Sequence, residues 1–534
     1  MRARSADSVA VEKTLSSSAR STAMVMGITT VSRLLGFVRQ AAVNAVFGAS
    51  GSADVLNAVF NIPNNLRKLL AEGALSSAFI PVLSQTSNDP QARKAGAPQD
   101  IVRSLLTFQG LVLIPLLVLS VVFARPITRF ILDFPEVERI ELAAELFRWF
   151  IHYTLLISIS AVLVGTLNSR NRFLVPATTP LLFSICVIVS ILLLHRVLGL
   201  YAMAAGALVG GVAQIVVQVP QFKALGFDFR PTFNFRNEHF RRIMRRWMPV
   251  VAASSVFAIN QQVSLYFASG LEDGSASALA NAVIFWQLPQ GIFGVSIMTV
   301  LFPRMSREAA ANDRVALKRT LGFGVRGIVA LIVPSSILLA MLGPEIVAMA
   351  FQRGNFGLAD TVRTAEVLAA YCIGMAGVSA FGFLQRFYYS HGDYRTPTIT
   401  AVCVAAIDIG LSLWLKETPL RVVGLAVANS VAFTAGAIAL LIRSKGVVGG
   451  VETGAILATL AKTVLATAPA VVVIVVQRRL FGAWWQTGSS VGGFGMIALI
   501  GTIAAGLVAV GFVLLRVEVV STIIRAQTQR RRNP

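Results

Sequence analysis

The chain has 534 residues, of which 55% are hydrophobic and only 13% are charged. Soluble domains carry about 25% charged residues, so this composition excludes an ordinary soluble protein and indicates a polytopic membrane protein. The formal net charge of +22 does not point to nucleic acid, because the basic residues lie in short clusters between apolar runs.

Apolar segments long enough to span a bilayer recur along the whole chain after a polar start. Residues 1–22 lack the apolar core and cleavage site of a signal peptide, so we expect a cytoplasmic N-terminal tail. A span needs about 20 mostly apolar residues, and this template predicts about 14 transmembrane helices. They centre near residues 35, 67, 112, 157, 183, 209, 257, 290, 332, 376, 406, 432, 469 and 504.

The distribution of lysine and arginine sets the orientation of these helices. Basic residues concentrate in the loops on one side, which predicts that the N-terminus and the C-terminus are both cytoplasmic. The densest cluster, Phe235 to Trp247, overlaps a predicted basic cytoplasmic loop at 221–244, and we expect it to lie as an amphipathic segment on anionic lipid. Residues 517–534 form a second basic cytoplasmic tail.

Two parts of the chain resemble each other. "GTLNSRNRFLVP" at Gly165–Pro176 is similar to "GFLQRFYYSHGDYRTP" at Gly382–Pro397, and Ser52–Pro81 is less clearly similar to Ser275–Pro303. The offset stays near 220 residues, as an internal repeat requires. We therefore predict an all-α integral membrane fold with two pseudo-symmetric six-helix lobes around a central cavity and two C-terminal helices. The lobes occupy 23–220 and 245–443, and the two further helices, numbers 13 and 14, occupy 444–516.

The first two predicted spans carry polar stripes at helical spacing. The first has Thr29, Arg33, Gly36, Gln40 and Asn44, with Arg39 beside them; the second has Asp54, Asn57, Asn61, Asn64, Lys68, Glu72 and Ser76, with Arg67 beside them. A charge at the bilayer centre costs about 2.5–3.5 kcal/mol or more, so we expect both stripes to line a wet cavity.

The charge of these stripes indicates an anionic ligand. Arg33, Arg39 and Arg67 outnumber the acids Asp54 and Glu72. Guanidinium groups bind phosphate oxygens in pairs, so the surplus favours a phosphate-bearing substrate. An alternative is that Lys68 and Glu72 form a structural ion pair or that the basic side chains reach the membrane interface.

At this point the residues resemble a known family. The stretch "SRLLGFVRQAAVNAVFGASGSADVLNAVFNIPNNLRKLLAEGALSSAFIPVLS", from Ser32 to Ser84, is similar to the amino-terminal signature of the MviN/MurJ family. These are the bacterial lipid II flippases of the multidrug/oligosaccharidyl-lipid/polysaccharide exporter superfamily. "GTLNSRNRFLVPA" and "FYYSHGDYRTP" resemble two further family landmarks, so the resemblance covers essentially the whole chain.

The resemblance implies a flippase of the bacterial cytoplasmic membrane. It would move undecaprenyl-pyrophosphate-linked peptidoglycan precursor, lipid II, to the outer leaflet by alternating access, with Arg33, Arg39 and Arg67 as cavity arginines and Asp54 as the acid near the outer end of the second span. The sequence departs from the family at two places: the eighth span has Ile284 where many members have arginine, and Gln40 replaces an acid. Membrane lipids, and cell-wall synthesis and division proteins, are the other expected partners.

Energy coupling is left open between sodium, protons and the membrane potential. The family's sodium site uses polar groups on spans seven, eleven and twelve, and the resemblance places Asp408, Ser412 and Asn429 there. A lone carboxylate such as Asp408 in an apolar span indicates ion coupling or a structural partner such as Asn429. Two roles are open for the further polar residues of spans seven and eight, which either line the cavity wall or pack between helices: Asn260, Gln261, Gln262, Gln287 and Gln290.

The sequence contains no catalytic constellation, nucleotide-binding loop or metal-ligand cluster, so we expect no enzyme activity and no cofactor. Two alternatives to a lipid II flippase stay open. One is a superfamily exporter of another lipid-linked oligosaccharide or of drugs, although cationic drugs favour carboxylates where this chain has arginines. The other is a non-transporting scaffold for cell-wall enzymes.

Overall fold

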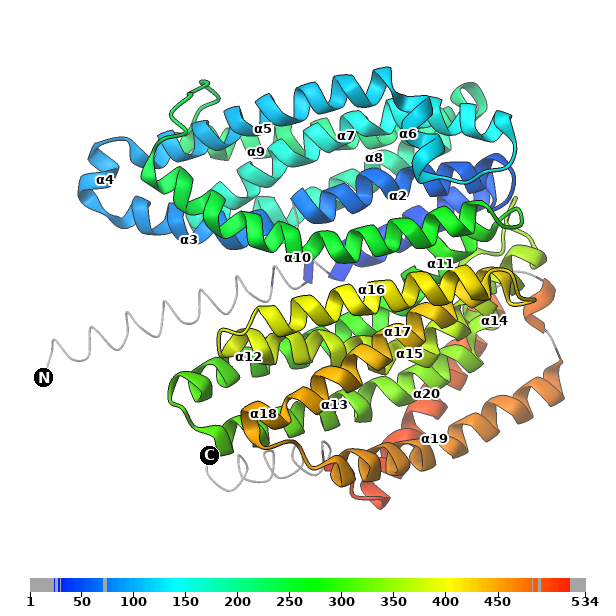
Figure 1. Ribbon diagram of the computed structural model, residues 1–534. Helices are drawn as coiled ribbons and strands as arrows, with labels where there is room; N and C mark the ends of the chain where they lie inside the picture. Colours follow the sequence, from blue (N-terminus) through cyan, green and yellow to red (C-terminus); the bar gives the residue numbers. More distant parts are fainter. Residues whose placement is uncertain are drawn as a thin grey trace, which may run out of the picture. The chain divides into compact units, whose positions relative to one another are not determined.

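The computed structural model describes residues 24, 27–28, 30–70, 74–482, 484–487 and 491–518. This part of the chain contains helices and no β-strand, which confirms the predicted all-α class. It divides into two compact units (Figure 1). The first unit comprises Met1–Phe47 and Val55–Ala258, and the second comprises Gly48–Asp54 and Ile259–Pro534.

The first unit begins with a helix at residues 30–47 and packs its other helices around α7 (Val137–Ser169). Of the most apolar stretch of α7, 72% is buried, so α7 is the central helix of this unit. The remaining helices are α2 (Ser52–Leu70), α3 (Ala74–Asn88), α4 (Pro90–Lys94), α5 (Ala97–Val122), α6 (Ala124–Ile131), α8 (Leu174–Leu198), α9 (Tyr201–Ala224) and most of α10 (Glu238–Ser269).

The second unit packs around α15 (Leu358–Ser390), which buries the same 72% share of its most apolar stretch. The eighth predicted span consists of α11 (Ser275–Pro289), a π-helical segment η1 (Gln290–Gly294) and α12 (Val295–Ala310). The other helices are α13 (Arg314–Met341), α14 (Gly343–Phe351), α16 (Arg395–Leu415), α17 (Arg421–Arg443), α18 (Lys445–Val448), α19 (Thr453–Phe481), η2 (Trp484–Thr487) and α20 (Val491–Leu514).

The two units repeat one another helix by helix. The central helices α7 and α15 have 33 residues each, and each is followed by two helices in the same order, α8 and α9 or α16 and α17. The corresponding helices start about 220 residues apart, which is the offset that the sequence repeat predicts. The repeat is therefore present in the order and spacing of these helices as well as in the short similar stretches of sequence.

Glycine allows close packing within the second unit. A Cβ atom at Gly374 of α15 would lie 2.3 Å from the Cα atom of Ser430 on α17, and one at Gly377 would lie 2.8 Å from the Cα atom of Thr434. The Ser430 hydroxyl donates a 2.8 Å hydrogen bond to the carbonyl oxygen of Ala370. Small residues and interhelical hydrogen bonds replace the hydrophobic effect between membrane helices, so these contacts fix α17 against α15.

Eleven helices in the described residues are long and apolar enough to cross a membrane. The other three of the predicted spans, centred near residues 35, 67 and 257, fall on the helix at 30–47, on α2 and on α10. These three carry polar or charged side chains that lower their apolar content. The structure thus contains a helix at each predicted position, while the number of fourteen spans stays a prediction.

The predicted basic loop at 221–244 is shorter in the structure. Helix α9 continues to Ala224 and α10 begins at Glu238. Phe240 and Ile243 of α10 are buried in a core cluster of the first unit, whereas Arg241 and Arg245 are exposed. The apolar face of this segment therefore covers protein, not lipid, and only its arginine face is open.

Ion pairs attach the ends of the C-terminal helices α19 and α20 to other helices of the second unit. Arg478 of α19 forms hydrogen bonds of 2.7 and 2.8 Å with the two carboxylate oxygens of the fully buried Glu345 on α14, and also donates to the carbonyl oxygen of Met341. After α20, Glu518 accepts two hydrogen bonds, of 2.6 and 3.1 Å, from Arg326 of α13. The charge of Arg326 inside a predicted span is thereby balanced.

Candidate functional site

The polar stripes of the first two helices meet in the first unit. The side-chain amide of Gln40 donates to Oδ1 of Asn44 at 3.1 Å on its own helix and to Oδ1 of Asn57 on α2 at 3.2 Å. All three side chains are buried. The two stripes that the sequence predicts therefore meet along one polar seam. At Gln40, Asn44 and Asn57 the side chains of the two helices are hydrogen-bonded to one another.

Arg39 lies beside this seam and between two aromatic rings. Its guanidinium carbon is 5.6 Å from the ring centre of Phe60 on α2 and 5.3 Å from that of Phe183 on α8. Cation–π contacts of this kind orient a guanidinium group without neutralising its charge. Arg33, about two turns earlier, is exposed.

Accessibility increases along the stripe of α2. Asn57 is 4% exposed, whereas Asn61 and Asn64 are half-buried. The Asn61 amide donates a 2.9 Å hydrogen bond to the backbone carbonyl of Asn57, which holds the side chain along the helix. The side chains of Arg67 and Lys68, and all of Glu72, lie outside the described residues, so their predicted place in the stripe stays a prediction.

The first predicted residue of that stripe, Asp54, lies in the second unit. Its carboxylate is 1% exposed and accepts hydrogen bonds from the backbone N–H of Ser277 at 2.6 Å and of Gly274 at 3.2 Å. These donors are at the N-terminus of α11, where backbone N–H groups have no partner within the helix. The structure thus gives Asp54 a capping role that polar spacing on α2 does not reveal.

A second carboxylate, from the turn before α11, caps the start of α2 in return. Asp273, in the turn before α11, accepts hydrogen bonds of 2.7 and 2.8 Å from the backbone N–H of Gly51, directly before α2. Gly51 and Asp273 are 222 residues apart, which is the offset of the internal repeat. The two repeated turns therefore exchange caps: each supplies an aspartate to the start of the other's helix.

A buried polar cluster surrounds Asp408 in the second unit. Asp408 is 1% exposed, and its Oδ2 accepts hydrogen bonds from the side-chain amides of Asn260 on α10 at 2.7 Å and of Asn429 on α17 at 2.9 Å. The hydroxyl of Ser412 donates to Oδ1 at 3.4 Å. Oδ1 of Asn260 is buried and has no hydrogen-bond partner among the described residues.

The structure therefore brings together the three residues assigned to ion coupling, Asp408, Ser412 and Asn429, and adds Asn260. Asn260 stands out in the sequence as a polar residue in an apolar span, but this pattern does not indicate that its side chain contacts Asp408. Ile284, where many family members have arginine, is half-buried on α11. Within the described residues no three His, Cys, Asp or Glu side chains are placed to hold a metal ion.

Solved structures with this fold are membrane transporters. A structure described as lipid II flippase MurJ in an inward closed conformation matches with a TM-score of 0.75 at 23% identity, covering 94% of this chain and 99% of its own. An inward-facing multidrug resistance MATE transporter of the MOP superfamily matches with a TM-score of 0.64 at 13% identity, covering 80% and 98%. The chain thus shares the fold of these membrane transporters.

The sequence comparisons identify the family within this class. The model of the family described as lipid II flippase MurJ matches residues 43–494. A probable lipid II flippase MurJ from Borreliella burgdorferi is 36% identical over 74% of this chain and 77% of its own, and one from Thermotoga maritima is 31% identical over 78% and 83%. The chain belongs to the MurJ family of lipid II flippases, which are transporters and not enzymes.

Proposed function

We propose that this protein moves lipid II from the inner to the outer leaflet of the bacterial cytoplasmic membrane. The match to the lipid II flippase family over residues 43–494 carries the proposal. It is supported by relatives named as lipid II flippases and by the multiple apolar helices of a multi-pass inner membrane protein. Transport of this kind makes and breaks no bond, so the residues that matter are those that bind and release.

Arg33, Arg39 and Arg67 bind the pyrophosphate in this proposal. A guanidinium group presents several N–H donors in one plane and matches two phosphate oxygens at once. The aromatic rings of Phe60 and Phe183 hold the guanidinium of Arg39 in one orientation, which lowers the entropy lost on binding. Arg39 thus supplies a charge that is already positioned for a diphosphate.

The polar residues of α2 serve the part of the headgroup that follows the pyrophosphate. Asn61 and Asn64, which are half-buried, offer amide donors and acceptors suited to sugar hydroxyls and peptide groups, and Lys68 and Glu72 extend the same stripe. Asn57 lies on this stripe too, and its hydrogen bond with Gln40 would have to open for it to contact the headgroup. Asp54 acts differently, because its carboxylate is engaged by backbone N–H groups of α11. We assign to Asp54 a positioning role: it holds the turn at Gly274–Ser277 and releases it during the transport cycle.

A cation at Asp408 would couple the cycle to an ion gradient. Sodium prefers oxygen ligands, and the carboxylate of Asp408, the hydroxyl of Ser412 and the amide oxygens of Asn260 and Asn429 form a set of that kind. The fit is supported by Oδ1 of Asn260, a buried oxygen that accepts no hydrogen bond within the part of the chain that the structure describes. A proton on Asp408 is the alternative, and the membrane potential adds about 2.3 kcal/mol per charge per 100 mV for an anion moving outward.

The orientation follows from charge: we propose that both termini are cytoplasmic, since basic residues concentrate in the loops on that side. The protein would then receive lipid II where its cytoplasmic synthesis ends and deliver it to cell-wall synthesis and division proteins at the outer face. An exporter of drugs is not favoured, because the MATE transporters share only the fold at 13% identity or less with this chain.

The test is complementation of a bacterial strain depleted of its own flippase, combined with an assay of the leaflet in which lipid II is accessible. Growth together with lipid II in the outer leaflet is the expected result. A protein that inserts at normal abundance but restores neither growth nor outer-leaflet lipid II would be a scaffold instead, and the proposed transport activity would be wrong.

A further inference from the structure

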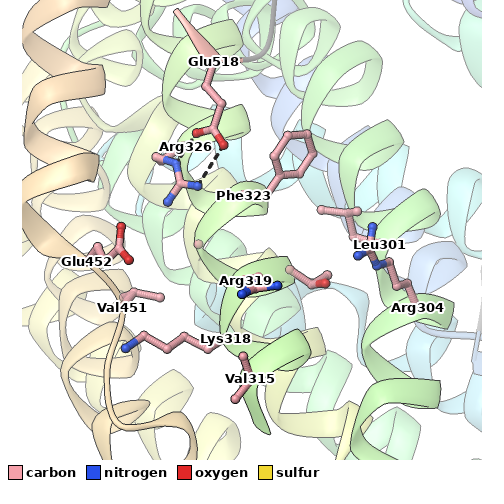
Figure 2. A pocket seen from close by; sticks show the side chains of 12 residues that line it. Leu301, Arg304, Val315, Lys318, Arg319, Phe323, Arg326, Val451, Glu452 and Glu518 are labelled. Carbon is pink, nitrogen blue, oxygen red and sulfur yellow. Dashed lines mark hydrogen bonds and ion pairs between the residues drawn. The ribbon is translucent and has the colours of Figure 1, made fainter. Parts of the chain in front are cut away.

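A pocket of about 600 Å³ lies at one end of the second unit, outside the residues assigned to transport. Its walls are the middle of α12, the first half of α13 and the segment that leads into α19, and Glu518 closes one side (Figure 2). Ligand pockets commonly have volumes of about 300–1,000 Å³. The pocket is therefore large enough for a headgroup-sized molecule.

Four basic side chains line this pocket, and two of them are neutralised. Arg304 forms a 2.8 Å ion pair with Glu308, and Arg326 forms a 2.6 Å ion pair with Glu518. Figure 2 shows the second pair at one end of the pocket, with Arg319 and Lys318 further along α13.

Lys318 and Arg319 form no ion pair within the residues that the structure describes. Glu452 lines the pocket from the segment before α19 and is exposed. With this carboxylate included, the basic side chains still outnumber the acidic ones. The pocket therefore keeps a net positive charge, located on the first turns of α13.

Apolar side chains line the rest of the pocket. Leu301 of α12 is buried, Phe323 of α13 is half-buried, and Val451 faces them from the segment before α19 (Figure 2). A helix rises about 1.5 Å per residue, so Lys318 and Arg326 are separated by about 12 Å along α13. The charges of Lys318 and Arg319 thus lie near the start of α13, and Phe323 lies about one turn further along the helix.

We propose that this pocket binds one anionic glycerophospholipid, with its phosphodiester on Lys318 and Arg319 and the start of its acyl chains along Leu301 and Phe323. Basic pockets between membrane helices bind anionic lipid headgroups, and one lipid charge matches the small positive excess. The apolar wall favours a lipid over free phosphate, and the small excess favours a phosphodiester over a pyrophosphate.

The bound lipid joins α13 to the segment that leads into α19, so it stabilises the docking of the two C-terminal helices. The proposed orientation places it in the inner leaflet, but binding at this pocket does not depend on the proposed transport activity. The probe is phosphatidylglycerol, with zwitterionic phosphatidylcholine as the reference lipid.

The experiment titrates the purified full-length protein with each lipid and counts bound lipids by native mass spectrometry. The test variant is Lys318→Gln/Arg319→Gln. The matched control is Arg93→Gln/Lys94→Gln, which removes the same two residue types from the exposed end of α4. A basic residue near anionic lipid contributes about 1 kcal/mol, so phosphatidylglycerol should bind the test variant about tenfold or more weakly and the control unchanged.

Two competitors separate the sources of the phosphate. Glycerol phosphate, which lacks acyl chains, should not displace phosphatidylglycerol, and undecaprenyl pyrophosphate should displace it no better than phosphatidylcholine does. Three results would overturn the proposal. Equal binding of phosphatidylglycerol by wild type and test variant would mean that the pocket holds no lipid. Displacement by glycerol phosphate would mean a simple anion site, and displacement by undecaprenyl pyrophosphate would make the pocket part of the substrate path. Thermal unfolding of the lipid-free variants confirms that both are folded.

An Arg39→Ala variant keeps this assay independent of transport. Arg39 is not among the pocket residues, so this variant should bind phosphatidylglycerol like the wild type even if lipid II flipping is lost. Failure of the lipid-binding proposal and failure of the proposed transport activity therefore give different results.

Discussion

The carboxylate of Asp54 accepts a 2.6 Å hydrogen bond from the backbone N–H of Ser277, at the first turn of α11. Across the same contact, the carboxylate of Asp273 accepts the N–H of Gly51 before α2. A carboxylate at a helix N-terminus accepts a hydrogen bond from a backbone N–H that has no partner within the helix, and its charge interacts favourably with the helix dipole. The two turns are therefore held by a reciprocal pair of caps.

Replacing Asp54 by alanine should loosen the start of α11. Loss of a cap costs about 0.5–2 kcal/mol, so hydrogen exchange at the Ser277 amide should become about tenfold faster, while Asp54→Asn, which keeps one acceptor oxygen, should have an intermediate effect. Asp89→Ala is the control, because Asp89 caps the short helix α4 in the same way at an exposed site. Unchanged exchange at Ser277 in Asp54→Ala would show that the cap does not hold the turn.

Arg39→Ala should reduce lipid II flipping by about tenfold or more, since hydrogen bonds to charged groups contribute about 1.5–3 kcal/mol. Arg39→Lys should recover part of the activity, because lysine keeps the charge but lacks the planar fork. Flipping is measured by lipid II accessibility in the outer leaflet, and immunoblotting of membranes measures abundance. A parallel loss of protein from the membrane would instead assign Arg39 a structural role between Phe60 and Phe183.

Asp408→Asn should remove the dependence of transport on an ion gradient. The substitution keeps the shape of the side chain but removes the charge that would bind a cation or the carboxyl that would bind a proton. The measurement is lipid II flipping while sodium and pH are varied separately, with Ser412→Ala as a milder change in the same cluster. If wild type and Asp408→Asn respond identically to both ions, the cluster around Asp408 is structural.

The loop before α10 should be sensitive to acid. Arg103 of α5 donates two hydrogen bonds of 2.6 Å to Asp228, and this contact lowers the pKa of the Asp228 carboxyl below its usual value. A carboxyl whose pKa is lowered by folding contributes stability above its unfolded pKa, about 4, and loses that contribution as the pH falls through the folded value.

The stability difference between wild type and Asp228→Asn should therefore be present at neutral pH and shrink below about pH 4. Thermal unfolding in detergent, measured across this range, checks the prediction. Asp133→Asn is a control in another loop of the same unit. A difference that grows as the pH falls would contradict the assigned sign.

Helical spacing predicted which residues of the first two helices share a face. Gln40, Asn44 and Asn57 lie on the predicted stripes and are joined by hydrogen bonds, but all three are buried, so the wet cavity expected around them stays a prediction. The association of Asp408 with Asn429 was also expected, because a carboxylate in an apolar span needs a polar partner.

The features that the sequence did not predict depend on groups that residue types do not reveal. The partners of Asp54 are backbone N–H groups of Gly274 and Ser277, which every residue except proline possesses. The π-helical segment at Gln290–Gly294 depends on one extra residue per turn, and apolar periodicity does not register it. The segment after Phe235 was expected to be amphipathic and to lie on lipid, whereas its buried Phe240 and Ile243 place its apolar face against the protein.

The division of the chain has a consequence for producing the second unit by itself. Residues Gly48–Asp54 come far earlier in the sequence than the rest of this unit, which runs from Ile259. A fragment that begins at Ile259 would lack Asp54, so the backbone N–H groups of Gly274 and Ser277 would lose the carboxylate that accepts their hydrogen bonds. Helix α11 would then begin with open donors, because backbone N–H groups at a helix start have no partner within the helix.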